Sequence, residues 1–339
     1  MASTLKVAVL GTGSLGKEHV RIYAELARAG RVELAGIYDA APETAQKIAA
    51  KHSARVFASV TEAAAASDAL SIVTPTTTHF ELAKAMLQQG KHLLVEKPMT
   101  DNAAQAAELV LLAQQNKCVL QVGHVERFNP VFNYLETIAT DPRFIETHRL
   151  SPFPARSTDI GVVLDLMIHD LDVVLAFVKS PVVSVDAVGI AVLSKSEDFA
   201  NARLRFVNGC VANLTASRIS VERMRKIRVF SGGANPSYVS LDYRAQEGYI
   251  CRLAHEGEEK SSLFKKILKA KDSTIVSEFG GKRIVREPVP IEKAEPLRVE
   301  LQSFVDCVHA RQTPVVSGES AKLALDLAFE ITRQVQLVK

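Results

Sequence analysis

KVAVLGTGSLGKEH, residues 6–19, is the stretch that decides the fold of this chain. Its first half is apolar and β-branched, and its second half has the spacing Gly-x-Gly-x-x-Gly before a helix-like segment. That order predicts a strand, a tight turn and a helix whose first backbone N–H groups face an anion. Gly11 permits the turn, Gly13 lets the backbone approach a pyrophosphate, and Gly16 lets the helix pack closely on the strand. We therefore expect a dinucleotide to bind at Gly11, Gly13, Ser14, Leu15 and Gly16.

The end of the next β-branched run indicates which dinucleotide binds. Val32–Tyr38 leads into Asp39, and an acidic residue about 20 residues beyond the last glycine of such a motif meets the adenosine ribose. A carboxylate there accepts hydrogen bonds from a 2′-hydroxyl and repels a 2′-phosphate. The sequence therefore predicts NAD rather than NADP as the cofactor. A loop aspartate beside ordinary turn glycines is the alternative interpretation.

The rhythm of apolar runs predicts two domains. Up to about residue 122, short β-branched runs alternate with Ala-rich amphipathic segments, which is typical of βαβ units and a doubly wound parallel sheet. These predicted strands are Lys6–Leu10, Val32–Tyr38, Ala69–Val73, His92–Val95 and Val119–Val122. We assign residues 1–123 to a Rossmann domain that binds NAD.

The second half of the chain has a different rhythm. Successive strand-like runs, with Asn208-Gly209 as a hairpin turn, predict an α/β domain with an open, largely antiparallel sheet. These runs are Val182–Leu193, Ala202–Phe206, Cys210–Ala216, Lys226–Ser231 and Ser237–Tyr243. We assign residues 124–339 to a domain for substrate binding and oligomerisation. Its closing helical segments, Glu295–Arg311 and Ser320–Val335, either complete this domain or pack back on the Rossmann domain.

Composition excludes several classes of protein. The 339 residues are 47% hydrophobic and 23% charged, with a formal net charge of +3, which argues against disorder and against a nucleic-acid partner. No apolar run approaches the length of a membrane span or of a secretory signal. The four cysteines lie far apart, so we expect reduced thiols and a cytoplasmic protein. The basic stretch 260–271 is expected to be a solvated amphipathic helix or loop.

Polar residues follow three of the predicted strands, where ligands of open α/β sheets bind. Thr74-Pro75-Thr-Thr-Thr-His79 follows the third strand, Glu96-Lys97-Pro98 the fourth, and Gly123-His124-Val-Glu126-Arg127-Phe-Asn129 the fifth. For the charged pair after the fourth strand, a solvated turn is the alternative. We expect the nicotinamide side of the cofactor site to contain Thr74, Pro75, His79, Glu96 and Lys97.

Together these segments resemble the Gfo/Idh/MocA family of NAD(P)-dependent dehydrogenases, over nearly the whole chain. The resemblance rests on residues 11–19, 74–79 and 96–98, and on Asp165-Leu-Met-Ile-His169-Asp170, which is similar to a DxxxHD-like helix of that family. It implies a Rossmann domain followed by an open antiparallel sheet used for oligomer contacts, and hence a homodimer or homotetramer. By position it also implies Lys97, Asp165 and His169 as the catalytic set.

The residues give this assignment their own physical case. Asp165 and His169 lie four apart, so on a helix they share one face. Oxidation of a secondary alcohol needs a base and a positive charge near the developing alkoxide. An imidazole titrates near neutral pH, so His169 is the default base with Asp165 orienting it, and Lys97 is either the cation or the base itself. A surface-exposed pair, or a metal site with Asp172, remains as an alternative; we expect no metal.

The substrate is indicated by residues 123–130, which resemble the branch of the family that oxidises UDP-N-acetylglucosamine at C3 on the way to 3-amino lipid A precursors. The diphosphate needs cations; the candidates are Arg127, Arg149 and Arg156, with ordinary surface ion pairing as the alternative. The runner-up is a dehydrogenase of a free sugar or inositol. The substrate contacts expected in either case are His124, Glu126, Arg127, Asn129, Arg156, Asp165 and His169. A regulator that binds NAD without turnover is the alternative of another class.

Overall fold

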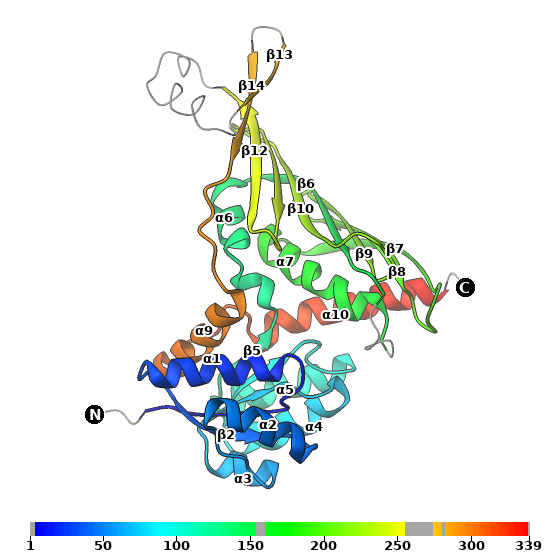
Figure 1. Cartoon of the computed structure of the whole chain (residues 1–339). Helices are drawn as coiled ribbons and strands as arrows, with labels where there is room; N and C mark the ends of the chain where they lie inside the picture. The colour runs from blue at the N-terminus through cyan, green and yellow to red at the C-terminus, as the bar shows by residue number, and fades with distance from the viewer. Residues whose placement is uncertain (1–3, 154–159, 255–273, 280–281, 338–339) are drawn as a thin grey trace. The chain divides into compact units, whose positions relative to one another are not determined.

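The computed structural model describes residues 4–153, 160–254, 274–279 and 282–337 (Figure 1). It divides into two compact units. The first unit comprises Met1–Phe128 and Glu295–Phe329, and the second comprises Asn129–Ala294 and Glu330–Lys339. Arg156 and the basic stretch 260–271 lie outside the described residues. Within the described residues, no helix has both the length and the apolar composition needed to cross a bilayer.

The first unit is built on a parallel five-stranded sheet in the order β2-β1-β3-β4-β5. The strands are β1 Lys6–Leu10, β2 Glu33–Tyr38, β3 Ala69–Ile72, β4 His92–Glu96 and β5 Leu120–Gly123. The chain passes from β1 outward to β2, and then returns to the other side of β1 for β3. The strand order therefore reverses at β1 and β3, and a ligand of such a sheet binds beyond the carboxyl ends of these two strands.

Helices cover both faces of this sheet, which explains why its inner strands are almost wholly buried. The helices of this unit are α1 Gly16–Arg28, α2 Pro42–His52, α3 Val60–Ala65, α4 Thr76–Gln88, α5 Ala103–Gln115 and α9 Pro296–Ala310, and α10 Gly318–Leu337 begins in it. Val7 and Val9 of β1 pack with α1, α2 and α9 in one apolar cluster. The intervening Ala8 and Leu10 are fully buried and point to the opposite face because side chains alternate along a strand.

Helix α9 belongs to the first unit although it follows the second sheet in sequence. Leu301, Phe304, Val305 and Val308 form an i, i+3, i+4, i+7 stripe that is buried in the cluster with α1. An ion pair of 2.7 Å between Arg298 and Glu25 of α1 adds a contact at its edge. The division between the units falls within α10.

The second unit is a nine-stranded sheet in the order β13-β14-β12-β11-β10-β6-β9-β8-β7. The pair β6–β9 is parallel and every other pair is antiparallel. The strands are β6 Pro142–Leu150, β7 Val182–Ile190, β8 Phe199–Phe206, β9 Val211–Ser217, β10 Met224–Ser231, β11 Ser237–Asp242, β12 Glu247–Leu253, β13 Thr274–Phe279 and β14 Lys282–Pro288. The sequence-based prediction of a largely antiparallel α/β unit is confirmed.

One face of this sheet is covered and the other is open. The covered face presents apolar residues such as Ala202, Leu204 and Leu214 to the π-helical segment η2, Val163–Met167, and to α7, Ile168–Val178, which pack against the central strands. A further helix of the unit is α6, Pro130–Ile138. Successive side chains along each strand point alternately to the covered and the open face. The open face carries half-exposed aromatic and charged residues, including Phe230, which is 42% exposed.

Candidate active site

The glycine turn after β1 is tight at its two ends and open in its middle. Gly11 has a φ of +87° and donates its N–H to the Tyr38 carbonyl at 2.8 Å. A Cβ on Gly16 would lie 2.0 Å from the Gly11 carbonyl oxygen, so no side chain fits there, whereas a Cβ on Gly13 would meet nothing within 4 Å. Ser14 and Leu15 are exposed at the same turn. The backbone at residues 13–15 is therefore accessible to a ligand.

A cavity of about 690 Å³ lies beside this turn. It brings together Gly11, Gly13, Asp39, Thr74 and Pro75, from the carboxyl ends of three neighbouring strands. The sequence did not single out its remaining lining residues, which are Leu10, Tyr38, Ala40, Val60, Val73, Thr77, Thr78, Glu81 and Leu82. Several of these lie in the first turns of α4. They could have been predicted from the sequence, because Pro75 marks the start of that helix.

Asp39 joins β2 to the glycine turn. Its Oδ2 accepts hydrogen bonds from the Thr12 N–H at 2.7 Å and the Thr12 hydroxyl at 2.8 Å, and its Oδ1 accepts one from the Ala41 N–H at 2.9 Å. Burial alone would raise the pKa of this carboxyl, but the hydrogen bonds from Ala41 and Thr12 hold the pKa below its ordinary value. Asp39 is therefore a fixed negative charge on the wall of the cavity at neutral pH.

His79 connects the loops that follow β3 and β4. It is 1% exposed, with Nδ1 2.9 Å from the Pro98 carbonyl oxygen and Nε2 2.8 Å from the Thr74 carbonyl oxygen. Burial is the largest influence on this imidazole and lowers its pKa. A neutral ring donates from one nitrogen only. His79 does not line the cavity; its contacts hold the Thr74 loop against the loop that begins at Lys97.

Lys97 stands at the carboxyl end of β4, next to β3 in the sheet, and is half-buried. The positive charge of Lys97 acts on His124, which follows β5 and is 1% exposed. Burial, and then the neighbouring charges of Lys97 and Arg127, lower the pKa of His124 to about 3. His124 is therefore a neutral imidazole at physiological pH.

The segment after β5 is more enclosed than its polar residues suggested. Glu126 is 4% exposed and Asn129 is 2% exposed, while Arg127 is half-exposed. Asn129 caps α6, because its Oδ1 accepts from the Val131 N–H at 3.1 Å and its Nδ2 donates to the Tyr243 carbonyl at 3.0 Å. An Asn before a Pro at a helix start is a known capping pattern, so this structural role could have been found in the sequence.

In the second unit, Asp165 and His169 flank the junction of η2 and α7. The predicted α-helix therefore begins as a π-helical turn, which carries Asp165, and His169 is the second residue of α7. Both side chains are half-buried. The start of the turn is fixed by Glu197, whose Oε1 accepts from the Val163 N–H at 3.3 Å. Single π-helical turns are frequent at functional sites.

Arg149, one of the expected cations for a diphosphate, pairs with a carboxylate of its own unit. Its Nε and Nη2 donate to the two carboxylate oxygens of Asp170 at 3.1 and 2.8 Å, and the two side chains are 4% and 6% exposed. The pair is bidentate and buried, so Arg149 secures the first turn of α7 to β6. The notion of ion pairing as the alternative role of this arginine therefore has a specific partner in Asp170, and a contact of Arg149 with a diphosphate stays a prediction. Of the other two candidates, Arg127 is half-exposed, and Arg156 lies outside the described residues.

The alternative of a metal site has no support among the described residues, where no group of three or more His, Cys, Asp and Glu side chains could hold a metal ion. Asp172 is 2% exposed on α7.

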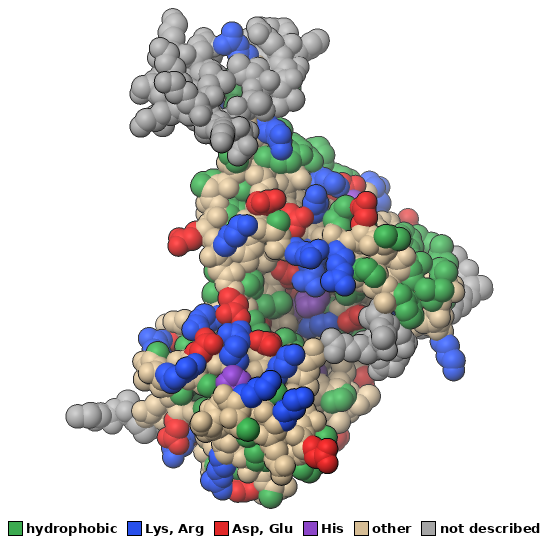
Figure 2. Space-filling view, in the orientation of Figure 1, with side chains coloured by type: hydrophobic (Ala, Val, Ile, Leu, Met, Phe, Trp, Pro, Cys, Tyr) green, Lys and Arg blue, Asp and Glu red, His purple; other side chains and the backbone are tan. Residues whose placement is uncertain are grey.

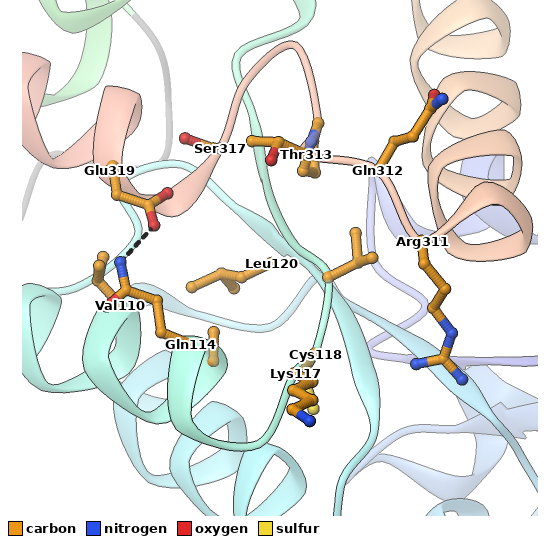
Figure 3. A pocket seen from close by; sticks show the side chains of 13 residues that line it. Val110, Gln114, Lys117, Cys118, Leu120, Arg311, Gln312, Thr313, Ser317 and Glu319 are labelled. Atoms are coloured by element: carbon orange, nitrogen blue, oxygen red, sulfur yellow. Dashed lines mark hydrogen bonds between the residues drawn. The ribbon is translucent and has the colours of Figure 1, made fainter.

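A second cavity, of about 580 Å³, lies at the opposite end of the first sheet (Figure 3). Leu120 at the start of β5 lies in its centre, with Lys117 and Arg311 on one side and a hydrogen bond of 2.9 Å between Gln114 and Glu319 on the other. It contains none of the predicted site residues. The candidate site is therefore at the carboxyl ends of the strands.

Comparison with known proteins agrees with this geometry. Residues 5–124 match the family described as "Oxidoreductase family, NAD-binding Rossmann fold", and residues 140–232 match the "GFO/IDH/MocA C-terminal domain". UDP-N-acetylglucosamine 3-dehydrogenase from Acidithiobacillus ferrooxidans is 35% identical over 333 residues, which are 98% of this chain and 97% of that protein. Inositol 2-dehydrogenase from Rhizobium meliloti is 29% identical over 203 residues, 57% of this chain and 61% of that protein.

A solved structure is similar over the same length. The structure of UDP-N-acetylglucosamine 3-dehydrogenase GnnA from Acidithiobacillus ferrooxidans has a TM-score of 0.86 and 34% identity, and covers 99% of this chain and 98% of that one.

Proposed function

The chain belongs to the Gfo/Idh/MocA oxidoreductase family, and from this premise we propose that it oxidises C3 of UDP-N-acetylglucosamine to a 3-oxo sugar with NAD. The observation that carries the proposal is the 35% identity to a UDP-N-acetylglucosamine 3-dehydrogenase over 98% of the chain. The open glycine turn and the cavity beside it support the cofactor half of the proposal.

The residues present fit NAD. The unobstructed backbone at Gly13 leaves room for a pyrophosphate at the start of α1, and Asp39 offers a negative charge to the ribose. Thr74 and Pro75 line the same cavity. A bound NAD would supply the hydride acceptor at this site. The chain's own groups then have to hold the hydroxyl and take its proton.

We assign these roles to three side chains. Lys97 stabilises the negative charge that develops on the substrate oxygen. His169 accepts the hydroxyl proton, and Asp165 orients the imidazole. The pair of Arg149 and Asp170 supports this assignment because it fixes the turn of α7 that carries His169.

The cofactor preference is tested by replacing Asp39 with asparagine, which keeps an oxygen for Thr12 but removes the charge. We expect the ratio of kcat/KM for NAD to kcat/KM for NADP to fall by about 10-fold or more, because the repulsion of a 2′-phosphate disappears. The measurement is initial-rate kinetics with both cofactors. Glu33→Gln, at the other end of β2, is the matched control. An unchanged ratio in Asp39→Asn would refute the NAD assignment.

The substrate is tested by NADH formation from NAD with UDP-N-acetylglucosamine, N-acetylglucosamine, glucose and myo-inositol, with a trap for 3-oxo sugars. Turnover restricted to the UDP-sugar supports the proposal. Turnover of a free sugar or of inositol overturns it in favour of the second candidate, which the inositol 2-dehydrogenase relative favours. Binding of NAD without turnover of any sugar would instead indicate a regulatory protein.

We also propose that a second copy of the chain covers the open face of the second sheet, giving a homodimer or homotetramer. Figure 2 shows hydrophobic side chains gathered over β7 and β8. Among these strands' residues, Val188 is 45% exposed and Ile190 is 54% exposed, and both lie on the open face. Large exposed apolar patches mark interaction sites.

The four cysteines are all free thiols, which supports a cytoplasmic location.

The assembly is tested with Ile190→Glu. A charge on the open face should convert the oligomer to a monomer in light scattering at micromolar concentration, because a buried unpaired carboxylate opposes association. Val221→Glu is the control, since Val221 is 96% exposed in the loop between β9 and β10. A monomeric wild-type protein would contradict the proposal.

A further inference from the structure

A buried pair of polar side chains includes the residue that precedes Lys97 in the chain. His19 on α1 and Glu96 at the end of β4 have side chains that are 0% and 9% exposed, and His19 Nε2 lies 3.2 Å from Glu96 Oε1. Neither ring nitrogen of His19 has a well-oriented hydrogen bond to any described residue. A buried imidazole and a buried carboxylate are unfavourable unless each compensates the other. The Glu96 carboxylate is therefore the group that accounts for a polar side chain at position 19.

Gly123 provides the space into which this carboxylate fits. Glu96 and Gly123 are partners in the β4–β5 ladder. A Cβ on Gly123 would lie 2.6 Å from the carboxylate carbon and from both of its oxygens, so any larger residue there would displace the Glu96 side chain. The carboxylate thus lies against the backbone of β5 and faces His19.

The same carboxylate reaches the backbone of the next residue. Glu96 Oε2 accepts a hydrogen bond from the Lys97 N–H at 3.3 Å. The Glu96 carboxylate therefore lies against three groups: the imidazole of His19, the backbone of Gly123 and the Lys97 N–H. His19 also belongs to the helix that starts at the glycine turn, since α1 begins at Gly16.

We infer that His19 and Glu96 are positioning residues that hold Lys97 through its backbone, an inference that rests on the proposed role of Lys97 in the reaction. The pair couples the helix that receives the cofactor phosphates to the strand that presents the catalytic ammonium. Glu96, which the sequence placed among the cofactor contacts, acts here by fixing the loop that begins at Lys97. Loss of the imidazole leaves the carboxylate uncompensated, and the carboxylate and the Lys97 backbone then shift together.

Tyr23, one turn further along α1, provides a matched control. Its hydroxyl lies 2.9 Å from the Ser71 hydroxyl, and the side chain is fully buried. Tyr23→Phe therefore removes a buried hydrogen bond between α1 and the sheet without removing a contact to the Lys97 loop. A purely structural role for His19 predicts the same behaviour for variants at the two positions.

The test compares His19→Leu, His19→Gln, Gly123→Ala and Tyr23→Phe by kcat at saturating substrates, by NADH affinity and by melting temperature. His19→Leu and Gly123→Ala are expected to lower kcat by about 10-fold or more with NADH affinity within about 3-fold of wild type, because small displacements of a catalytic group are costly. His19→Gln should recover most of the loss because its amide nitrogen can replace Nε2. Tyr23→Phe should lower the melting temperature and leave kcat unchanged.

The outcomes separate this inference from the proposed function. If the wild type is active and His19→Leu and Gly123→Ala keep its kcat, or if Tyr23→Phe loses as much kcat as they do, the positioning role is overturned and the proposed function stands. If the wild type turns over no sugar, the proposed function fails. Crystal structures of wild type and Gly123→Ala then decide: a shift of about 1 Å or more at the Lys97 Cα supports the inference, and an unchanged position overturns it.

Discussion

Replacing Lys97 with alanine is expected to lower kcat by about 100-fold or more, with little change in NADH affinity. The ammonium stands at the end of β4, while the cavity that we assign to the cofactor is lined by residues of the glycine turn, β2, β3 and α4. Loss of Lys97 should therefore remove stabilisation of the alkoxide and not the binding of the cofactor. Stopped-flow or steady-state kinetics, together with NADH fluorescence titration, measure the two effects separately.

Lys97→Arg distinguishes the two roles left open for this residue. Arginine keeps the positive charge but cannot act as a base. If Lys97 only stabilises the alkoxide, Lys97→Arg should retain more activity than Lys97→Ala; if it is the base, the two variants should be equally impaired. Lys179→Ala is the control, because that side chain is 72% exposed and pairs with Glu136. Wild-type turnover in Lys97→Ala would remove the catalytic assignment.

Local patterns were enough to predict the Rossmann fold and to single out several residues that the structure brings to one cavity. The glycine spacing, the acidic end of the second strand and the loop after the third strand are each read within a few residues, and Gly11, Asp39 and Thr74 lie together in one cavity. Strand ends of a parallel sheet meet at one edge, so the topology alone brings such residues together.

Contacts between side chains that are far apart in the sequence could not be predicted in this way. An arginine in a strand has the same pattern whether it binds a phosphate or pairs with a carboxylate, and the choice between these for Arg149 depends on how α7 lies on β6, where Asp170 meets it. The same holds for His19 and Glu96, which come from α1 and β4. The π-helical start at Asp165 depends on contacts from residue 197, which no periodicity within the helix encodes.

Replacing Arg218 with methionine is expected to have the largest effect on stability, about 3–5 kcal/mol less free energy of unfolding, because it leaves a buried charge uncompensated. Arg218 and Asp198 are both fully buried, with Nε 2.8 Å from Oδ1. The guanidinium also donates to the Ile160 carbonyl at 2.7 Å and to the Ser194 hydroxyl at 2.7 Å. Urea unfolding at pH 7 measures the loss, with the exposed Arg333→Met as the control; a variant as stable as wild type would contradict the prediction.

The same pair gives the second unit a pH dependence of known sign. Burial would raise the pKa of Asp198, but the hydrogen bonds from Arg218, the Leu193 N–H and Ser194 hold it well below its ordinary value. A carboxyl whose pKa is lowered by folding stabilises the protein above its unfolded pKa, near ~3.9, and this stabilisation is lost as the pH falls below that value. Wild type should therefore lose stability on acidification more steeply than Arg218→Met.

The buried pair of Arg218 and Asp198 is linked to the turn that carries Asp165 through one residue, Glu197. Asp198 accepts hydrogen bonds from the backbone of the loop at 192–194, and its chain neighbour Glu197 binds the Val163 N–H at the start of the turn that carries Asp165. A Cβ on Gly161 would lie 1.8 Å from the Glu197 carboxylate, so that start has little freedom. Under conditions in which Arg218→Met stays folded, the kcat of this variant should therefore still be lower than that of wild type. The reason is that Asp165 and His169 lose the support that fixes their turn.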